Sequence, residues 1–229
     1  MSSRVRALTF DAGQTLVELD PVLLGARLGE RGVAVAAAAL EEAIAPAWLA
    51  YDAAVGTPRA WHAFMAATLE GAGVASAEVP ALVDWLWSEQ PRRNLWRRPV
   101  AGMLELADAA RAAGLRIGVI SNSEGRLAAL FDELGWGGRF DDVVDSGVLG
   151  IEKPAPGIFE ASFAALGVRA DEVVHIGDSW PADVLGACAL GARAIWFGRT
   201  DDRALPTGVA RAKDAAEVAA ALASFDVAT

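Results

Sequence analysis

Residues 4–16 of the chain read RVRALTFDAGQTL. Its first part, Arg4–Phe10, is short and rich in apolar residues, which predicts a β-strand. The strand ends at Asp11, and the residues that follow it, AGQTL at 12–16, predict a turn. Because ligands of open α/β sheets bind at the carboxyl ends of the strands, Asp11 lies where a binding site is expected.

Strands and helices alternate in the second part of the chain, from residue 98 onward. We predict strands at Leu115–Ile120, Val173–Ile176 and Ala192–Phe197, with a brief apolar step at Val143–Val144. Helices are predicted between and after them, at Met103–Ala113, Gly125–Leu134, Pro156–Leu166, Ala182–Leu190 and Asp214–Ala223. This alternation predicts an α/β fold with an open, parallel, doubly wound sheet of the Rossmann-like kind.

Residues 17–97 interrupt the alternation directly after the first strand. No strand is predicted in this segment, and its helical patterns are Pro21–Arg31, Val35–Tyr51, Pro58–Glu70 and Val79–Ser88. We therefore predict an α/β core formed by residues 1–16 and 98–229, and an all-helical cap domain inserted at residues 17–97.

Composition and charge narrow the class of protein. The 229 residues carry a formal net charge of -10, so the surface repels phosphate backbones and we expect no nucleic-acid partner. The N-terminus lacks a signal-peptide pattern and no stretch is apolar enough to span a bilayer, so we expect a cytoplasmic protein without a membrane partner. The single cysteine, Cys188, allows no internal disulfide and no cysteine-based zinc site. Both a monomer and a homodimer are compatible with the sequence.

Polar side chains follow the ends of three predicted strands. They are Asp11 and Thr15 after the first, Ser121 and Asn122 after the second, and Asp178 and Asp183 after Val173–Ile176. One of the two lysines of the chain, Lys153, lies in a loop before a helix. Clustered carboxylates repel one another unless they share a cation or a proton, and Mg²⁺ prefers such oxygen ligands. A carboxylate nucleophile beside a lysine and a hydroxyl suits hydrolysis through a covalent acyl-phosphate.

Four stretches, in this order and spacing, resemble the motifs of the haloacid dehalogenase superfamily. They are LTFDAGQTL at 8–16, IGVISNS at 117–123, GIEKPAPGIF at 150–159 and HIGDSWPADVLGA at 175–187. Taken together the four motifs are highly specific. The resemblance covers residues 1–16 and 98–229, and residues 17–97 would correspond to the helical cap that many members insert after the first motif.

The resemblance implies a role for each matching residue. It implies catalytic roles for Asp11, Lys153 and Ser121, with Asp11 as the nucleophile. The substrate, a small molecule, would be bound by Ser121, Asn122, Thr15 and Lys153. The implied cofactor, Mg²⁺, would be held by Asp11, Asp178, the backbone carbonyl of Gly13 and, as a support of the metal shell, Asp183.

The sequence departs from the family pattern at Gly13. Phosphatases of the superfamily usually carry a second Asp there, which protonates the leaving oxygen, and Gln14 stands where a glycine is usual. Gly13 has no proton to give, and general acid catalysis contributes roughly 10²- to 10⁴-fold in rate. We therefore expect a Mg²⁺-dependent phosphatase of small phosphorylated metabolites that forms an aspartyl-phosphate. It would act on phosphate esters with good leaving groups or on acyl phosphates, or use another acid such as His62, Glu18 or Asp20.

Three other interpretations follow from the same departure. The first is a 2-haloacid dehalogenase. True haloacid dehalogenases also lack the second Asp, but they carry Ser/Asn where Gly177-Asp178 stand and a Tyr where Phe159 sits. The second is a phosphonatase, which also lacks that Asp. Phosphonatases need a cap lysine, and residues 17–97 contain none, which argues against this interpretation. A catalytically weakened binding protein that retains the fold is the third. We interpret His175, which lies inside a predicted strand, as a structural residue.

Overall fold

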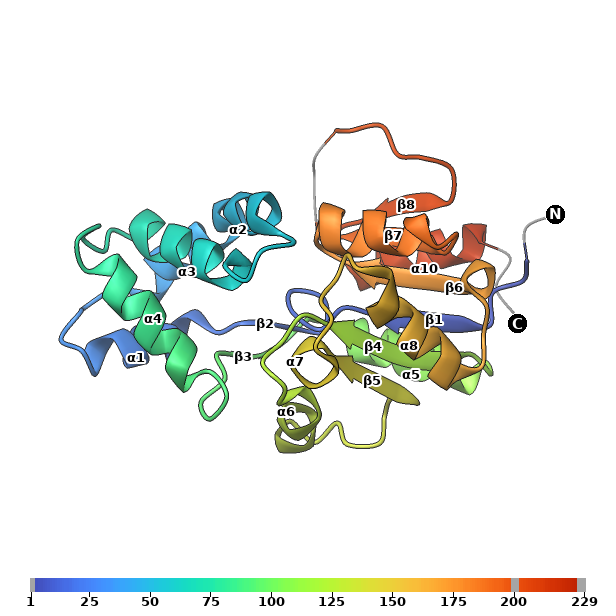
Figure 1. The fold of residues 1–229 in the computed structure, drawn as a ribbon, viewed down its shortest axis with the longest axis horizontal. Helices are drawn as coiled ribbons and strands as arrows, with labels where there is room; N and C mark the ends of the chain where they lie inside the picture. The colour runs from blue at the N-terminus through green and yellow to red at the C-terminus, as the bar shows by residue number, and fades with distance from the viewer. Residues whose placement is uncertain (1–2, 199–201, 226–229) are drawn as a thin grey trace. The chain divides into compact units, whose positions relative to one another are not determined.

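The computed structural model describes residues 3–198 and 202–225 (Figure 1). The chain divides into two compact units. One consists of Met1–Glu18 together with Pro99–Thr229, and the other of Leu19–Arg98. The first unit is built on a parallel sheet, whereas helices dominate the second.

The sheet of the first unit has six strands within the described residues, in the order β5-β4-β1-β6-β7-β8. They are β1 (Ala7–Phe10), β4 (Arg116–Ser121), β5 (Asp142–Asp145), β6 (Val173–Gly177), β7 (Arg193–Phe197) and β8 (Val209–Ala212). All neighbouring strands are parallel, which confirms the predicted open α/β sheet. The strand order reverses between β1 and β6, and such a switch point is where open α/β sheets bind ligands.

The inner strands β1, β6 and β7 have sequences that are rich in apolar residues. Every residue of β1, β6 and β7 is buried, as expected in a parallel sheet that is covered on both sides. The edge strand β8 is only partly buried and has the sequence VARA, whose arginine interrupts the apolar run. For this reason the sequence predicts no strand at 209–212, and the structure adds one.

Helices flank the sheet (Figure 1). They are α5 (Met103–Ala112), α6 (Leu127–Glu133), α7 (Ser146–Leu149), α8 (Pro156–Leu166), α9 (Gly186–Ala189) and α10 (Ala215–Ser224), with a 3₁₀ turn at Ala170–Glu172. Helix α8 contributes Ile158, Phe159 and Phe163 to a core cluster that also contains Ile120 of β4 and Val173 of β6. The packing of α8 therefore fixes the two strands on either side of β1.

The segment after β6 is wound differently from the prediction. In place of one helix at 182–190, a π-helix at Trp180–Leu185 precedes the short helix α9. Ser179 caps it by accepting a hydrogen bond from the backbone N–H of Ala182. π-Helical turns are rare and are frequently found at functional sites, and this one carries Asp183.

The second unit contains four helices among the described residues, as the sequence predicts. They are α1 (Pro21–Gly29), α2 (Ala37–Ala54), α3 (Ala60–Gly71) and α4 (Val79–Glu89). Aromatic side chains pack between them: the rings of Trp48 and Phe64 stack at 4.1 Å, and those of Trp61 and Trp87 lie 5.0 Å apart. None of the helices in the described part of the chain combines the length and the hydropathy that a membrane crossing requires.

Two short strands, β2 (Val17–Leu19) and β3 (Trp96–Pro99), pair with each other at the passages between the units. The backbone N–H of Asp20 donates to the carbonyl of Leu95, and that of Val100 donates to the carbonyl of Leu16, both at 2.9 Å. The sequence predicts no strand here, because each segment is too short for a period to be read and its partner is far away in the chain.

Candidate active site

The strands β4, β1 and β6 bring polar residues to one edge of the sheet. Asp11 follows β1, and its backbone N–H donates to the carbonyl of Ile176 at 2.8 Å, which extends the β1–β6 pairing by one residue. Ser121 is the last residue of β4, and Asp178 directly follows β6. The three predicted strand ends therefore meet as the parallel topology requires.

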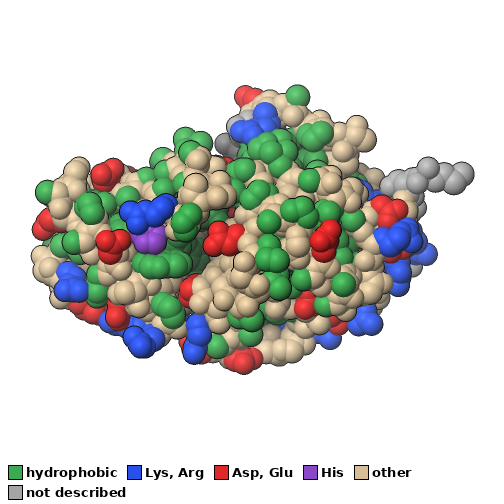
Figure 2. Space-filling view, in the orientation of Figure 1, with side chains coloured by type: hydrophobic (Ala, Val, Ile, Leu, Met, Phe, Trp, Pro, Cys, Tyr) green, Lys and Arg blue, Asp and Glu red, His purple; other side chains and the backbone are tan. Residues whose placement is uncertain are grey.

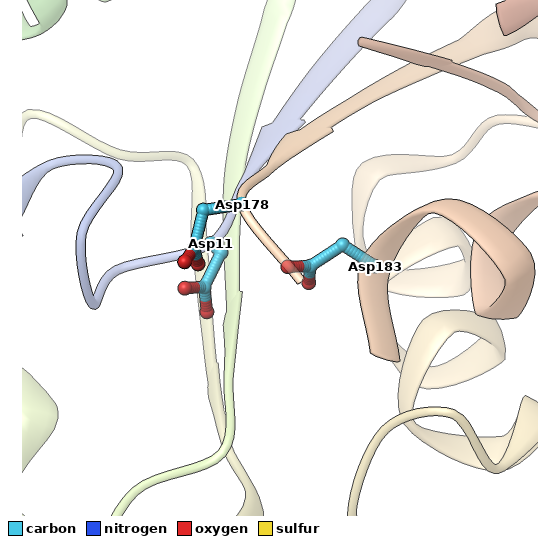
Figure 3. Close-up of side chains that lie close together, drawn as sticks. All are labelled: Asp11, Asp178 and Asp183. Carbon is cyan, nitrogen blue, oxygen red and sulfur yellow. The ribbon is translucent and has the colours of Figure 1, made fainter. Parts of the chain in front are cut away.

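Three buried carboxylates meet at this edge. Asp11, Asp178 and Asp183 each offer an oxygen, and these oxygens all lie within 4.8 Å of one another. Figure 3 shows the carboxylates of Asp11 and Asp178 side by side, with that of Asp183 directed toward them from the helical segment after β6. The three side chains come from two strand ends and one π-helix, and their mutual repulsion requires a shared cation or proton.

Lys153 supplies part of that positive charge. Its Nζ donates hydrogen bonds to Asp11 Oδ1 at 2.6 Å, to Asp183 Oδ1 at 2.6 Å and to the carbonyl of Ile120 at 2.8 Å. The side chain is 2% exposed, so all three ammonium donors are used inside the protein. Lys153 thus bridges two of the three carboxylates.

Asn122 fixes the backbone of Lys153. Its side-chain Nδ2 donates to the carbonyl of Lys153 at 3.0 Å, and its Oδ1 accepts from the backbone N–H of Lys153 at 2.7 Å. The side-chain amide of Asn122 therefore clamps the lysine loop to the end of β4. This contact gives Asn122 a supporting role in the site in addition to the predicted contact with substrate.

The charges of the cluster shift the proton affinities of its members. Burial raises the pKa of Asp11 above its ordinary value, although Lys153 opposes the shift. For Asp183 burial acts in the same direction, but the charge of Lys153 and the hydrogen bond from His175 outweigh it and hold its pKa well below the ordinary value. Burial disfavours the ammonium of Lys153, but Asp11 and Asp183 together raise its pKa. Lys153 is therefore charged, and its charge does not fully offset the cost of burying the carboxylate of Asp11.

The donor set fits a divalent cation such as Mg²⁺. The three carboxylates are oxygen ligands at short mutual distances, which is the chemistry that Mg²⁺ prefers. Asp183 already accepts from Lys153, His175 and the backbone N–H of Ser179, whereas Lys153 donates to a single oxygen of Asp11. The residues that would hold the ion are thus Asp11 and Asp178, with Asp183 in a supporting position. Gly13 follows Asp11 by two residues and forms an isolated β-bridge with Val17.

The loop after Asp11 contains two buried polar atoms that form no hydrogen bond within the described part of the chain. They are the hydroxyl of Thr15, a fully buried residue, and Nε2 of Gln14. Ser121, at the end of β4, is 4% exposed. The contacts of Thr15 and Ser121 with a substrate remain predictions.

Gln14 has a backbone φ of 58°, and among the described residues no other non-glycine has a positive φ. A Cβ atom in this left-handed region costs about 1–2 kcal/mol, which explains why glycine is usual at this position of the motif. We expect Gln14→Gly to have a free energy of unfolding about 1 kcal/mol above that of Gln14→Ala, its matched control, in urea titrations. Both variants remove the buried amide, so only the Cβ differs. Equal stabilities would contradict the strained conformation.

Sequence reasoning missed three contacts that organise the site. His175 Nε2 lies 3.1 Å from Asp183 Oδ1, and the backbone N–H of Ser179 donates to Asp183 Oδ2 at 3.0 Å. The indole N–H of Trp196 donates to the carbonyl of Asp178 at 2.8 Å. The polar ring of His175 in an otherwise apolar strand was the one feature of the sequence that could have indicated these contacts. The contact of Trp196 carries no sequence signal, because it depends on the pairing of β6 with β7.

Comparison with known proteins places the chain in a family. A phosphoglycolate phosphatase from Rhodospirillum rubrum is 31% identical over 194 residues, which are 83% of this chain and 78% of that protein. The human haloacid dehalogenase-like hydrolase domain-containing protein 3 is 29% identical over 84% of this chain and 81% of its own. The HAD-hydrolase YfnB from Bacillus subtilis, solved with magnesium, shares the fold with a TM-score of 0.69 at 19% identity, over 96% of this chain and 100% of that chain.

The four motifs and the parallel sheet that brings them together agree with the family comparison. The model of the haloacid dehalogenase-like hydrolases matches residues 5–191 and so spans both the helical unit and the acid cluster. The chain therefore belongs to the haloacid dehalogenase-like hydrolase family and is a hydrolase.

Proposed function

We propose that the protein is a Mg²⁺-dependent phosphatase that transfers the phosphoryl group of a small phosphorylated metabolite to Asp11. The observation that carries this proposal is the set of contacts around Asp11. Lys153 binds one oxygen of its carboxylate at 2.6 Å, and Asp178 lies beside it among the buried ligand atoms. The similar phosphoglycolate phosphatase supports a phosphate monoester of a small molecule as the substrate.

In the proposed reaction Asp11 is the nucleophile and the other residues of the site hold charge. A carboxylate oxygen of Asp11 attacks phosphorus, an O–P bond forms, and the bond between phosphorus and the leaving oxygen breaks. Lys153 stays on Oδ1 and offsets the negative charge, while Ser121 binds a phosphoryl oxygen. Water then attacks phosphorus, which releases inorganic phosphate and restores the carboxylate.

Mg²⁺ would be held by Asp11, Asp178 and the carbonyl of Gly13, with Asp183 in support. When bound, it supplies positive charge that steadies the nucleophile and the phosphoryl oxygens. The raised pKa of Asp11 supports this assignment, because Lys153 alone does not offset the cost of burying its charge. The proposed ion would therefore supply the positive charge that neutralises Asp11.

We propose that the helical unit at Leu19–Arg98 acts as the cap of the core and selects the substrate. Its bounds lie close to those predicted for the cap from the sequence, residues 17–97. The proposal is supported by its place in the chain, between the motif that contains Asp11 and the rest of the core. The two passages through β2 and β3 join it to the core.

The absence of a carboxyl group at Gly13 leads to a prediction about substrates. Without an acid to protonate the leaving oxygen, the first step depends on the stability of the leaving anion. We expect kcat/KM for aryl and acyl phosphates to exceed that for alkyl phosphates by roughly 10²- to 10⁴-fold. The measurement is a series of phosphate monoesters whose leaving alcohols differ widely in pKa, assayed with Mg²⁺.

Two controls make this series decisive. The variant Gly13→Asp supplies the missing carboxyl and is expected to raise the rate with alkyl phosphates and flatten the dependence on the leaving group. Excess chelator is expected to abolish phosphate release. A wild-type rate that is independent of the leaving group would contradict the missing-acid account. Halide release from a 2-haloacid in excess chelator would instead favour a dehalogenase.

A further inference from the structure

His175 occupies a place in the site that core packing does not explain. It lies in β6, is fully buried, and its register partner in β1 is Thr9. Its ring bridges two polar partners: Nδ1 lies 2.9 Å from the hydroxyl of Thr9, and Nε2 lies 3.1 Å from Oδ1 of Asp183. Both ring nitrogens are therefore used, and one of them reaches the acid cluster.

The chemistry of Asp183 fixes which ring nitrogen of His175 donates to it. The pKa of Asp183 is lowered, so its carboxylate is ionised and only accepts hydrogen bonds. Nε2 of His175 must then carry the hydrogen and donate. The hydroxyl of Thr9, which can donate or accept, satisfies Nδ1 on the other side of the ring. Phe159 holds the ring from the side, edge to face at 5.3 Å.

Asp183 is held by protein donors on both oxygens. Oδ1 accepts from Lys153 and His175, and Oδ2 accepts from the backbone N–H of Ser179. Gly177 provides the space, since a Cβ at that position would lie 2.3 Å from Cγ of Asp183. The carboxylate of Asp183, which anchors Lys153, is therefore fixed by its neighbours. Of the two side chains that donate to it, Lys153 also contacts Asp11, whereas His175 does not.

We propose that His175 is a positioning residue for the reaction proposed above, and that it acts on Asp11 through Asp183 and Lys153. The contacts form a continuous series from Thr9 in β1 through the imidazole and the carboxylate to the ammonium on Asp11. Loss of the Nε2 donor frees Asp183 to rotate. Lys153 then follows it and no longer keeps one geometry on the nucleophile.

Two substitutions separate positioning from packing. His175→Phe keeps an aromatic ring against Phe159 but removes the donor to Asp183. His175→Gln loses the ring but places an amide N–H near the position of Nε2. If His175 only fills the core, Phe is the better replacement; if it positions Asp183, Gln is better.

The scarcity of lysine gives a readout that needs neither metal nor turnover. The chain contains two lysines, Lys153 and Lys213, so ¹⁵N- and ¹³C-labelled lysine yields two side-chain signals in the metal-free protein. Lys213 is exposed and pairs with Glu217 at 2.8 Å, so it serves as the internal reference. We expect His175→Phe to shift the Lys153 signal and to speed its ammonium hydrogen exchange at least tenfold. His175→Gln is expected to stay close to wild type, and Lys213 to be the same in all three.

Thr9→Val provides a second route to the same answer. Valine keeps the shape of the strand residue but removes the hydroxyl that fixes the ring of His175. We expect Thr9→Val to shift the Lys153 signal in the same direction as His175→Phe, but by a smaller amount. An unchanged Lys153 signal in a folded His175→Phe protein, or equal signals in the Phe and Gln variants, would overturn the proposal.

Steady-state kinetics show whether the loss of the His175 donor affects the proposed reaction. With an aryl phosphate and Mg²⁺, kcat of His175→Phe is expected to fall roughly 10- to 100-fold with KM nearly unchanged, and His175→Gln to recover most of it. The two proposals fail separately. If the wild-type protein has no phosphatase activity that depends on Asp11, the proposed function is wrong. The lysine spectra would still show whether His175 positions Lys153.

Discussion

Asp11→Asn is expected to lower kcat for an aryl phosphate by roughly 10⁴- to 10⁶-fold, which is the scale on which loss of a covalent nucleophile acts. Asparagine keeps the shape of the side chain, but its amide oxygen is a poor nucleophile. The measurement is steady-state phosphate release with Mg²⁺. Asp108→Asn is the matched control, because Asp108 pairs with Arg139 on the surface and the same chemical change there should leave kcat unaltered. Activity of Asp11→Asn near that of wild type would exclude Asp11 as the nucleophile.

The loss of activity should not be accompanied by a loss of stability in the metal-free Asp11→Asn protein. Burial raises the pKa of Asp11 in the folded state, so the folded protein binds its proton more tightly than the unfolded chain. Ionised Asp11 therefore costs stability at neutral pH, and its removal should leave the free energy of unfolding equal or higher. This difference should shrink as pH falls through the raised pKa and disappear below the ordinary value of 3.8.

Lys153→Met is expected to impair both activity and stability. Methionine has a similar length but no charge, so Asp11 and Asp183 lose the ammonium that each contacts at 2.6 Å. Removal of one partner from a buried ion pair costs about 3–5 kcal/mol, because the remaining charges are left uncompensated. In urea titrations of the metal-free protein we expect a loss of this size at neutral pH, and a fall of kcat of roughly 10²-fold or more with Mg²⁺.

The matched control for this change is Lys213→Met. Lys213 is the other lysine of the chain and pairs with Glu217 on the surface, where such pairs contribute only about 0–1 kcal/mol. The deficit of Lys153→Met should also shrink in acid. Without the lysine, the pKa of Asp183 is expected to rise, so protonation relieves the repulsion as pH falls. A deficit that stays constant from neutral to acid pH would contradict the charge-balance account.

The parts of the structure that the sequence predicts are those with local physical signals. The apolar runs of β1, β4 and β6 are buried, and Asp11, Ser121 and Asp178 come at or just after their ends, so a parallel sheet had to bring them to one edge. The helices of the second unit are likewise marked by helical periodicity between glycines. These elements could be predicted because their signals lie in neighbouring residues.

The remaining features depend on contacts between residues far apart in the chain. Strand β2 becomes a strand only through β3, and β8 only through β7. The role of His175 depends on the register that places it beside Thr9 and on the π-helical turn that carries Asp183. A histidine in a buried strand is usually a packed residue, and no local pattern indicates that its ring reaches a carboxylate eight positions further on.

Acid quenching during turnover of a ³²P-labelled aryl phosphate shows directly whether Asp11 receives the phosphoryl group. With a good leaving group and no carboxyl at Gly13 to activate water, hydrolysis of the aspartyl-phosphate should be slower than its formation. We therefore predict a burst of the phenol close to one per protein, and label on the peptide that contains Asp11, released by hydroxylamine. A burst with label on another residue, or steady release without a burst and without labelled Asp11, would exclude Asp11 as the phosphoryl acceptor.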